Sequence, residues 1–187
     1  LTGSLSSAKV ALVVLPGASD DDVAAIRSTL TDAGASVVGR VTLSDNWQST
    51  SMNQYRTTLS TTLASHLASG AAKTASADGV VGYSIVQVLT TTGAETDLLR
   101  QILTDESTPI MTVDEDANGG ATAIVAVGPR AQASAVSNAT PAAETQSPDA
   151  LVGLGQALGS TNGVLVGDAS TRDAMISQVR ASGVAVT

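Results

Sequence analysis

Acidic side chains placed just after predicted strands are the groups of this sequence best suited to chemistry. Four of them are candidate ligands for a metal ion: Asp114, Glu115, Asp116 and Asp168. In open α/β sheets, ligands bind in the crevice beyond the carboxyl ends of the strands, so these carboxylates could gather near one edge of the sheet. Their oxygens suit a hard cation such as Ca²⁺ or Mg²⁺. The sequence favours the simpler alternative, in which the acidic run is a solvated turn and Asp168 leads into a helix.

Two further groups have both a chemical and a structural interpretation. The aspartates Asp20–Asp22 follow Ser19 at the start of a predicted helix, where capping and the helix dipole favour negative charge. A cation site built from them is the less favoured alternative. His66, the only histidine, lies beside the apolar stripe of another predicted helix. It could accept a proton or provide one metal bond, but we favour a surface or half-buried structural histidine.

Sulfur-containing and aromatic side chains are scarce. The chain has no cysteine, so disulfides, iron–sulfur clusters and thiolate metal sites are excluded. Met52, Met111 and Met175 are widely separated, which favours core packing over a soft-metal motif. The sequence leaves open whether Trp47 packs over the edge of the sheet or belongs to a partner surface.

Composition and motifs exclude several classes of protein. The 187 residues carry a formal net charge of −8, and their nine lysines and arginines are scattered, so we expect neither nucleic acid nor an anionic membrane surface as a partner. The chain has neither the three-glycine dinucleotide pattern nor a phosphate-binding loop. No nucleophile–base pair can be assigned either. We therefore expect no cofactor and no enzymatic activity.

The pattern of apolar residues predicts an α/β fold. Val10–Leu15 reads as a buried strand, and a helix capped by Ser19 follows it as far as Gly34. Ser36–Leu43 is the next strand, which completes a unit of two parallel strands joined by a helix. We expect a single domain over residues 1–187, three-layered and doubly wound (Rossmann-like), with a mainly parallel sheet.

The rest of the chain continues the same pattern. Further helices are predicted over residues 53–69, 92–104 (with a capping box from Thr92 to Glu95), 147–158 and 171–182, and further strands over 109–113, 122–127, 163–167 and 183–187. Residues 44–51, 70–79 and 130–147 are predicted as irregular connections, and Val80–Leu89 fits a strand or a helix equally well.

One antiparallel pair is expected within this sheet. The connection Asp114–Ala121 is too short for a parallel crossover, and its Asn118-Gly119 dipeptide is typical of a hairpin. We therefore predict that strand 109–113 pairs with strand 122–127.

The segment LPGASDDDVAAIRSTLTDAGASVVGRVTLSDNW, residues 15–47, resembles the actinobacterial copper-transport outer-membrane protein family (MctB-like). The resemblance rests on the apolar strand, the Asp-rich helix start, the Ala33-Gly34 ending and the Val-rich strand that reaches Ser44. The segments ATAIVAVG and GVLVGDAS resemble paired strands in the second half of the family.

This resemblance implies copper transport, described for the family as efflux or export through the outer envelope. It further implies a membrane anchor and a coiled coil ahead of this domain, so the chain would be a fragment of a membrane-anchored protein that faces the periplasm or cell wall. It implies no catalytic residue and no copper ligand. The composition even argues against copper binding by the domain itself, because Cu(I) prefers sulfur ligands and Cu(II) prefers imidazole.

Two hypotheses follow. The first is a soluble, non-enzymatic, envelope-facing domain of a copper-transport protein, which forms no pore by itself and acts through a second copy or an envelope protein partner. The alternative is a ligand- or divalent-cation-binding module that uses the strand-end carboxylates.

Overall fold

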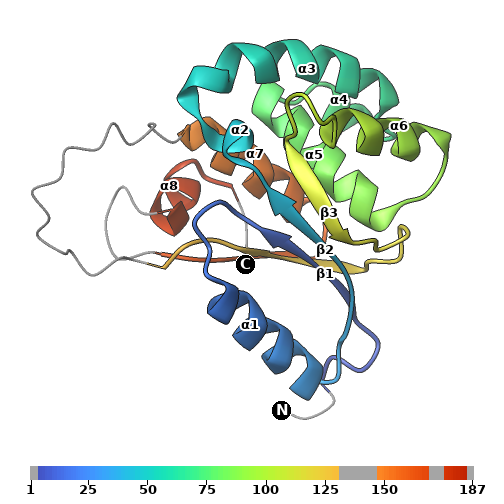
Figure 1. Ribbon diagram of the computed structural model, residues 1–187, viewed down its shortest axis with the longest axis vertical. Helices are drawn as coiled ribbons and strands as arrows, with labels where there is room; N and C mark the ends of the chain where they lie inside the picture. Colours follow the sequence, from blue (N-terminus) through green and yellow to red (C-terminus); the bar gives the residue numbers. More distant parts are fainter. Residues whose placement is uncertain (1–3, 131–146, 169–174, 185–187) are drawn as a thin grey trace, which may run out of the picture.

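The computed structural model describes residues 4–130, 147–168 and 175–184 and confirms an α/β fold (Figure 1). Its strands are β1 (Lys9–Val14), β2 (Ser36–Leu43), β3 (Met111–Glu115), β4 (Ala123–Val127) and β5 (Gly163–Val166). Its helices are α1 (Asp20–Asp32), α2 (Asp45–Gln48), α3 (Asn53–His66), α4 (Gly70–Lys73), α5 (Ala77–Thr90), α6 (Ala94–Leu103), α7 (Pro148–Gly159) and α8 (Met175–Ala181), with a short 3₁₀ helix η1 (Thr50–Met52).

The described strands form one sheet in the order β3-β2-β1-β4-β5. β1 pairs parallel with β2 and with β4, and β4 pairs parallel with β5. β3 is antiparallel to β2. Helix α1 packs on one face of the sheet, and α3, α5 and α7 lie on the other (Figure 1). The predicted mainly parallel, three-layer architecture with one antiparallel pair is therefore confirmed.

The partner of the antiparallel strand differs from the prediction. β3 pairs with β2, and the predicted hairpin between β3 and β4 does not form. Asn118 and Gly119 do adopt the positive φ angles of a tight turn, 47° and 64°. The loop packs instead against the end of α5. The contact is close: a Cβ on Gly119 would lie 2.5 Å from the carbonyl carbon of Thr91. Ala121 N–H then donates to Leu89 O, which carries the chain past β2 and β1 to the far side of β1.

Polarity explains this choice of neighbours. β4 reads AIVAV and is almost wholly buried, so it suits a place beside the central strand β1. β3 ends in the polar residues Asp114 and Glu115, and its residues alternate between more and less buried. A strand of this kind is tolerated at an edge of the sheet, where one side meets water.

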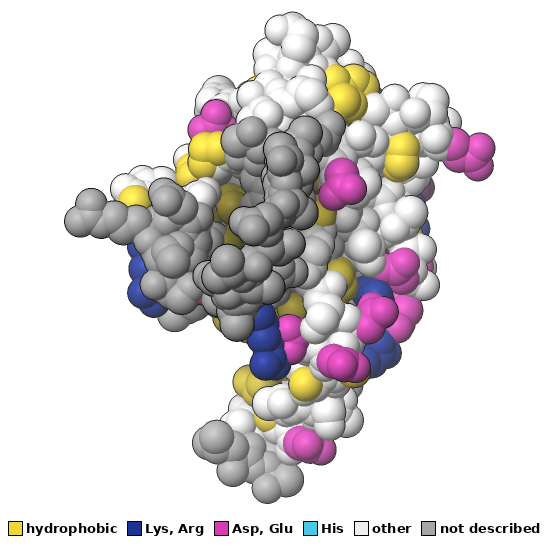
Figure 2. Space-filling view, turned by 60° about the vertical axis from the view of Figure 1, so that its left-hand side comes forward, with side chains coloured by type: hydrophobic (Ala, Val, Ile, Leu, Met, Phe, Trp, Pro, Cys, Tyr) yellow, Lys and Arg dark blue, Asp and Glu magenta, His cyan; other side chains and the backbone are white. Residues whose placement is uncertain are grey.

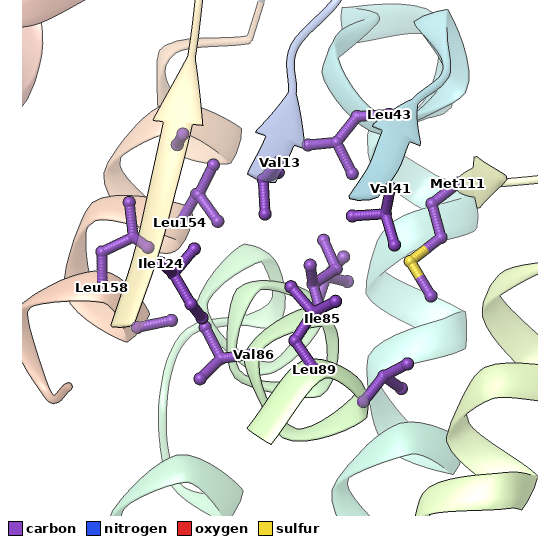
Figure 3. Packing of buried hydrophobic residues seen from close by; sticks show 14 of the residues in the cluster. Val13, Val41, Leu43, Ile85, Val86, Leu89, Met111, Ile124, Leu154 and Leu158 are labelled. Carbon is purple, nitrogen blue, oxygen red and sulfur yellow. The ribbon is translucent and has the colours of Figure 1, made fainter. Parts of the chain in front are cut away.

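Helix α5 is the centre of the larger core. Ser76 caps it by accepting a hydrogen bond from Gly79 N–H. The segment Val80–Leu89, which the sequence allowed as a strand or a helix, is therefore helical. The helix is buried almost all round because the sheet, α3, α6 and α7 surround it. Figure 3 shows Ile85, Val86 and Leu89 packed beneath side chains of the strands.

Glycines allow α5 and α7 to approach very closely. A Cβ on Gly82 would lie 2.6 Å from Gly153 O, and a Cβ on Gly153 would lie 2.4 Å from Asp78 O. Neither position has room for a side chain, because the obstacle is backbone rather than a flexible side chain. This contact fixes the distance between the two helices that carry much of the core.

A buried arginine holds the segment between β2 and α3. The Arg56 side chain is 1% exposed, and its Nε donates to Asp78 Oδ1 at 2.6 Å. Its other nitrogens donate to the carbonyl oxygens of Asn46 and Ser49 and to Asn53 Oδ1. The charge is thus fully hydrogen-bonded, as a buried guanidinium requires.

The connections contain more structure than the sequence predicts. Residues 44–51 include α2 and the start of η1, and Trp47 is 1% exposed within the main core rather than part of a partner surface. Residues 70–79 include α4. The predicted capping box of α6 is wrong: Gly93 is the N-cap, at φ 130°, and no side chain caps the helix.

Other local predictions are confirmed. Ser19 Oγ accepts a hydrogen bond from Asp22 N–H, and Gly34 has the positive φ of a helix end. Pro148 begins α7, although Ser147 makes no side-chain capping bond. Parts of three predicted segments lie outside the described residues. They are 131–146 of the predicted connection 130–147, 171–174 of the predicted helix 171–182, and 185–187 of the predicted strand 183–187.

We predict that Gly153→Val destabilises the protein by about 3 kcal/mol or more, because an added side chain must push α5 and α7 apart. Chemical denaturation monitored by circular dichroism measures this change. Gly70→Ala is the matched control: a Cβ on Gly70 meets nothing within 4 Å, so its effect should stay below about 1 kcal/mol. Equal stability of the Gly153→Val variant and the wild-type chain would contradict the packing described here.

Candidate functional site

The four candidate metal ligands do not come together. Because β3 runs antiparallel, Asp114, Glu115 and Asp116 lie toward the end of the sheet at which the parallel strands begin. Asp168 follows β5 and lies at the other end, where the parallel strands finish and where its N–H donates to Pro129 O. The predicted cluster required all the strands to finish at the same end of the sheet. The antiparallel β3 finishes at the other end, so the cluster does not form.

Each of the three clustered carboxylates faces an arginine instead. Glu115 accepts two hydrogen bonds from Arg27, at 2.5 Å and 2.9 Å. Asp116 pairs with Arg100. These two pairs join β3 and the turn after it to helices α1 and α6 respectively.

The third carboxylate, Asp114, belongs to the strand pair itself. Its Oδ2 lies 3.4 Å from Arg40 Nε on β2, and it accepts a hydrogen bond of 2.6 Å from Thr42 Oγ1. The acidic run therefore fastens an edge strand to its neighbours. On the face shown in Figure 2, acidic side chains likewise lie beside basic ones.

The pKa values of two of these carboxylates, Glu115 and Asp116, are lowered. The hydrogen bonds from Arg27 hold the pKa of Glu115 below its ordinary value, against the opposing effect of burial. The pKa of Asp116 is lowered first by the hydrogen bond from Asn118 N–H and then by Arg100. Both carboxylates are consequently charged and occupied at neutral pH. Among the described residues, no group of three or more His, Cys, Asp or Glu side chains could hold a metal ion.

Beyond the carboxyl ends of the parallel strands lies a hollow of about 280 Å³, whose lining includes Asp22, Gly128, Arg130 and Gly167. A Cβ on Gly17 would touch the ring of Pro129, and the Met175 side chain packs directly on Gly128 and Gly167. Asp22, the last of the three helix-start aspartates, pairs with Arg130. Capping and charge pairing thus account for Asp22, and Met175 is the core filler that the sequence predicts.

A second hollow beside α1, of about 360 Å³, is apolar. It lies between α1 and β5, and Leu5, Leu30, Val125 and Val164 are among the residues around it. Its lining contains no charged side chain. Because no set of polar groups converges on this hollow, it lacks the features of a specific ligand-binding or catalytic site.

His66 does have a partner, which the sequence did not indicate. Its Nδ1 lies 2.5 Å from Glu95 Oε2 on α6, with the side chains 22% and 64% exposed. The two residues line a hollow of about 330 Å³, together with Lys73, Gln87 and others. Glu95 lies 29 positions along the chain, and only the packing of α6 against α3 brings the pair together.

Arg56 is the other polar residue whose role the sequence analysis missed. A signal was present, since Arg56 lies seven positions before the buried Leu63 and therefore on the same face of α3. Its partners are backbone carbonyls, Asn53 and Asp78, so it acts as an internal anchor rather than a ligand-binding group.

We predict that millimolar Ca²⁺ or Mg²⁺ leaves the thermal midpoint of the chain unchanged. The reason is that arginines already neutralise the clustered carboxylates. Differential scanning calorimetry with and without each cation measures the effect. A cation-dependent rise of the midpoint that disappears in Asp114→Ala or Asp168→Ala would contradict this prediction, because binding to the folded state raises stability by mass action.

We also predict that Arg27→Met costs up to about 1 kcal/mol at pH 7, the usual range for a half-exposed ion pair. Glu115 has a lowered pKa in the folded state, so the stabilisation is present above the ordinary pKa of 4.5 and fades as the pH falls through the lowered value. Denaturation curves of both proteins at several pH values should converge in acid. Arg180→Met, which removes a charge with no ion pair among the described residues, is the control.

Comparison with known proteins identifies the family. No helix in the described part of the chain is long and apolar enough to cross a membrane. A search of curated proteins returns no match. The family model described as copper transport outer membrane protein, MctB, matches residues 1–187, the whole chain. The chain therefore belongs to the MctB family of copper transport outer membrane proteins.

Proposed function

We propose that this chain is a non-enzymatic, envelope-facing domain of a copper-export protein, anchored to the membrane through segments other than those described. The observation that carries the proposal is the family match over all 187 residues. The domain contributes a rigid folded body to the transport protein rather than a reaction.

The state of the polar side chains supports a role without catalysis. Three of the carboxylates that the sequence offers as candidate ligands are engaged in fold-forming pairs: Glu115 with Arg27, Asp116 with Arg100, and Asp114 with Arg40. A general base or nucleophile needs a free electron pair directed at a substrate. Strong pairing of this kind uses those electron pairs inside the protein.

The donor chemistry likewise argues against tight copper storage in the domain. Cu(I) prefers thiolate or thioether ligands, and the chain has no cysteine. Met111 is fully buried and Met175 is 8% exposed. A chain with one histidine can offer Cu(II) only one imidazole. We infer that the domain serves transport without a site of several copper ligands.

The structure gives the alternative function, a hard-cation module, no such support. Its proposed ligands lie at two edges of the sheet, and three of them face arginines.

We predict that cells lacking this protein accumulate copper and stop growing at lower external copper than the parent strain. Export removes copper, so its loss raises the steady-state content, which mass spectrometry of washed cells measures. Re-expression of the whole protein should restore the parental copper level, and zinc content serves as the control. Unchanged copper content and unchanged copper tolerance would rule out the proposed function.

A further inference from the structure

Helix α1 covers one face of the sheet incompletely. Among the described residues it is the only helix on that face, whereas α3, α5 and α7 cover the other (Figure 1). Two hollows, of about 280 Å³ and about 360 Å³, lie along one side of α1, above β4 and β5. We propose that these two hollows, together named the α1 groove, are the docking site for an amphipathic helix of a partner protein that carries basic residues in its last turn.

The α1 groove follows the helix along most of its length. Its first part lies between Asp22, Ala25 and Thr29 of α1 and the carboxyl ends of β4 and β5. Its second part lies between Leu30 and Val164, where β4 and β5 begin. Because α1 has 13 residues and a helix rises about 1.5 Å per residue, the groove is roughly 20 Å long. This is the length of a short helix.

Exposed apolar side chains concentrate in the α1 groove. Four large hydrophobic side chains of the described residues are more than a third exposed. Three of them line the two hollows: Leu5 (38%), Val164 (39%) and Val166 (39%). The fourth, Leu98, lies on α6, which packs on the other face of the sheet. A continuous apolar patch of this kind is typical of a surface that another protein covers.

The sheet on the other side of α1 is closed by polar groups. There Arg27 pairs with Glu115, and Arg40 pairs with Asp114 and lies 4.0 Å from Asp20. These pairs fill the space above β2 and β3. Strand β5 reads GVLV and has no polar side chain that could act in the same way. The β4–β5 side of α1 therefore remains open to an apolar partner.

The side chains of the α1 groove suit a helix as the occupant. Ala25 and Thr29 are four positions apart, so they lie on one face of α1, and both line the first hollow. Such small side chains let a second helix pack at the usual interaxial distance of about 8–10 Å. A second helix on this face would extend the helical layer that an α/β sheet places on each side.

Charge selects the partner and its direction. Asp20, Asp21 and Asp22 form the first turn of α1, at one end of the groove. Arg130 pairs with Asp22, so Asp20 and Asp21 keep this end negative. The chain has a formal net charge of −8, which repels a second copy and attracts a basic partner. A helix antiparallel to α1 places its last turn beside these aspartates, where lysine or arginine also interacts favourably with that helix's own dipole.

The test is isothermal titration calorimetry of the 187-residue chain with a synthetic peptide as long as α1, 13 residues. The peptide has leucine and alanine on one face and lysines in its last turn, and a hydrocarbon staple keeps it helical because short helices are marginal in water. We expect one-to-one binding that weakens about 10-fold or more in Val166→Lys, which buries a charge in the interface. Leu98→Lys, at an equally exposed apolar position on α6, is the matched control and should bind as the wild-type chain does.

A second peptide, with glutamates in place of the lysines, tests the charge and should bind about 5-fold more weakly. Equal binding of both peptides, no binding of the lysine peptide, or unchanged binding in Val166→Lys would overturn the proposal.

Self-association is measured separately by analytical ultracentrifugation of the chain alone. A dimer that Val166→Lys dissociates would make a second copy the occupant and would also overturn the proposal. Circular dichroism shows that the variants remain folded, and Val164→Lys provides a second substitution in the groove. The docking proposal does not depend on copper export, so failure of either experiment leaves the other valid.

Discussion

The burial of α5 between the sheet and α7 is the constraint on which the rest of the structure depends. The helix has few polar side chains and is enclosed on nearly every side. It can be enclosed only because Gly82 and Gly153 let the two helix backbones come together. A core without phenylalanine gains its density from such close approaches, since Val, Leu, Ile and Ala must fill the space that rings fill elsewhere. The ends of α5 then determine where Arg56, Gln87 and the loop at Gly119 find their partners.

The fold was largely accessible from sequence because it follows from local patterns. Val10–Leu15, the Ser19 cap and the glycine at position 34 identify the first unit, and the structure contains it almost as predicted. The pairing of β3 was not accessible in the same way. An Asn-Gly dipeptide predicts local backbone geometry, and the positive φ angles of a tight turn are present at Asn118 and Gly119. The neighbour of a strand, however, depends on how well each strand tolerates burial.

The same limit applies to the candidate site. The sequence showed that Asp114, Glu115 and Asp116 follow a strand, but their partners Arg27, Arg40 and Arg100 come from three separate elements. Acidic runs beside strands predict metal sites only if nothing neutralises them first. Here the acidic residues form ion pairs with the arginines, and these pairs hold the edge strand β3 against its neighbours. His66 shows the converse, since a residue that looked isolated has a carboxylate partner and an open hollow.

The polar groups named as candidates in the sequence thus serve the fold: Asp114, Glu115 and Asp116 are held by arginines, and His66 is held by Glu95. Anomalous diffraction at the copper edge, from crystals of the chain grown with Cu(II), tests this role of the carboxylates most directly. No copper peak is expected among Asp114, Glu115 and Asp116, because their arginines already neutralise them. A copper peak at those carboxylates, with their arginines displaced, would contradict it.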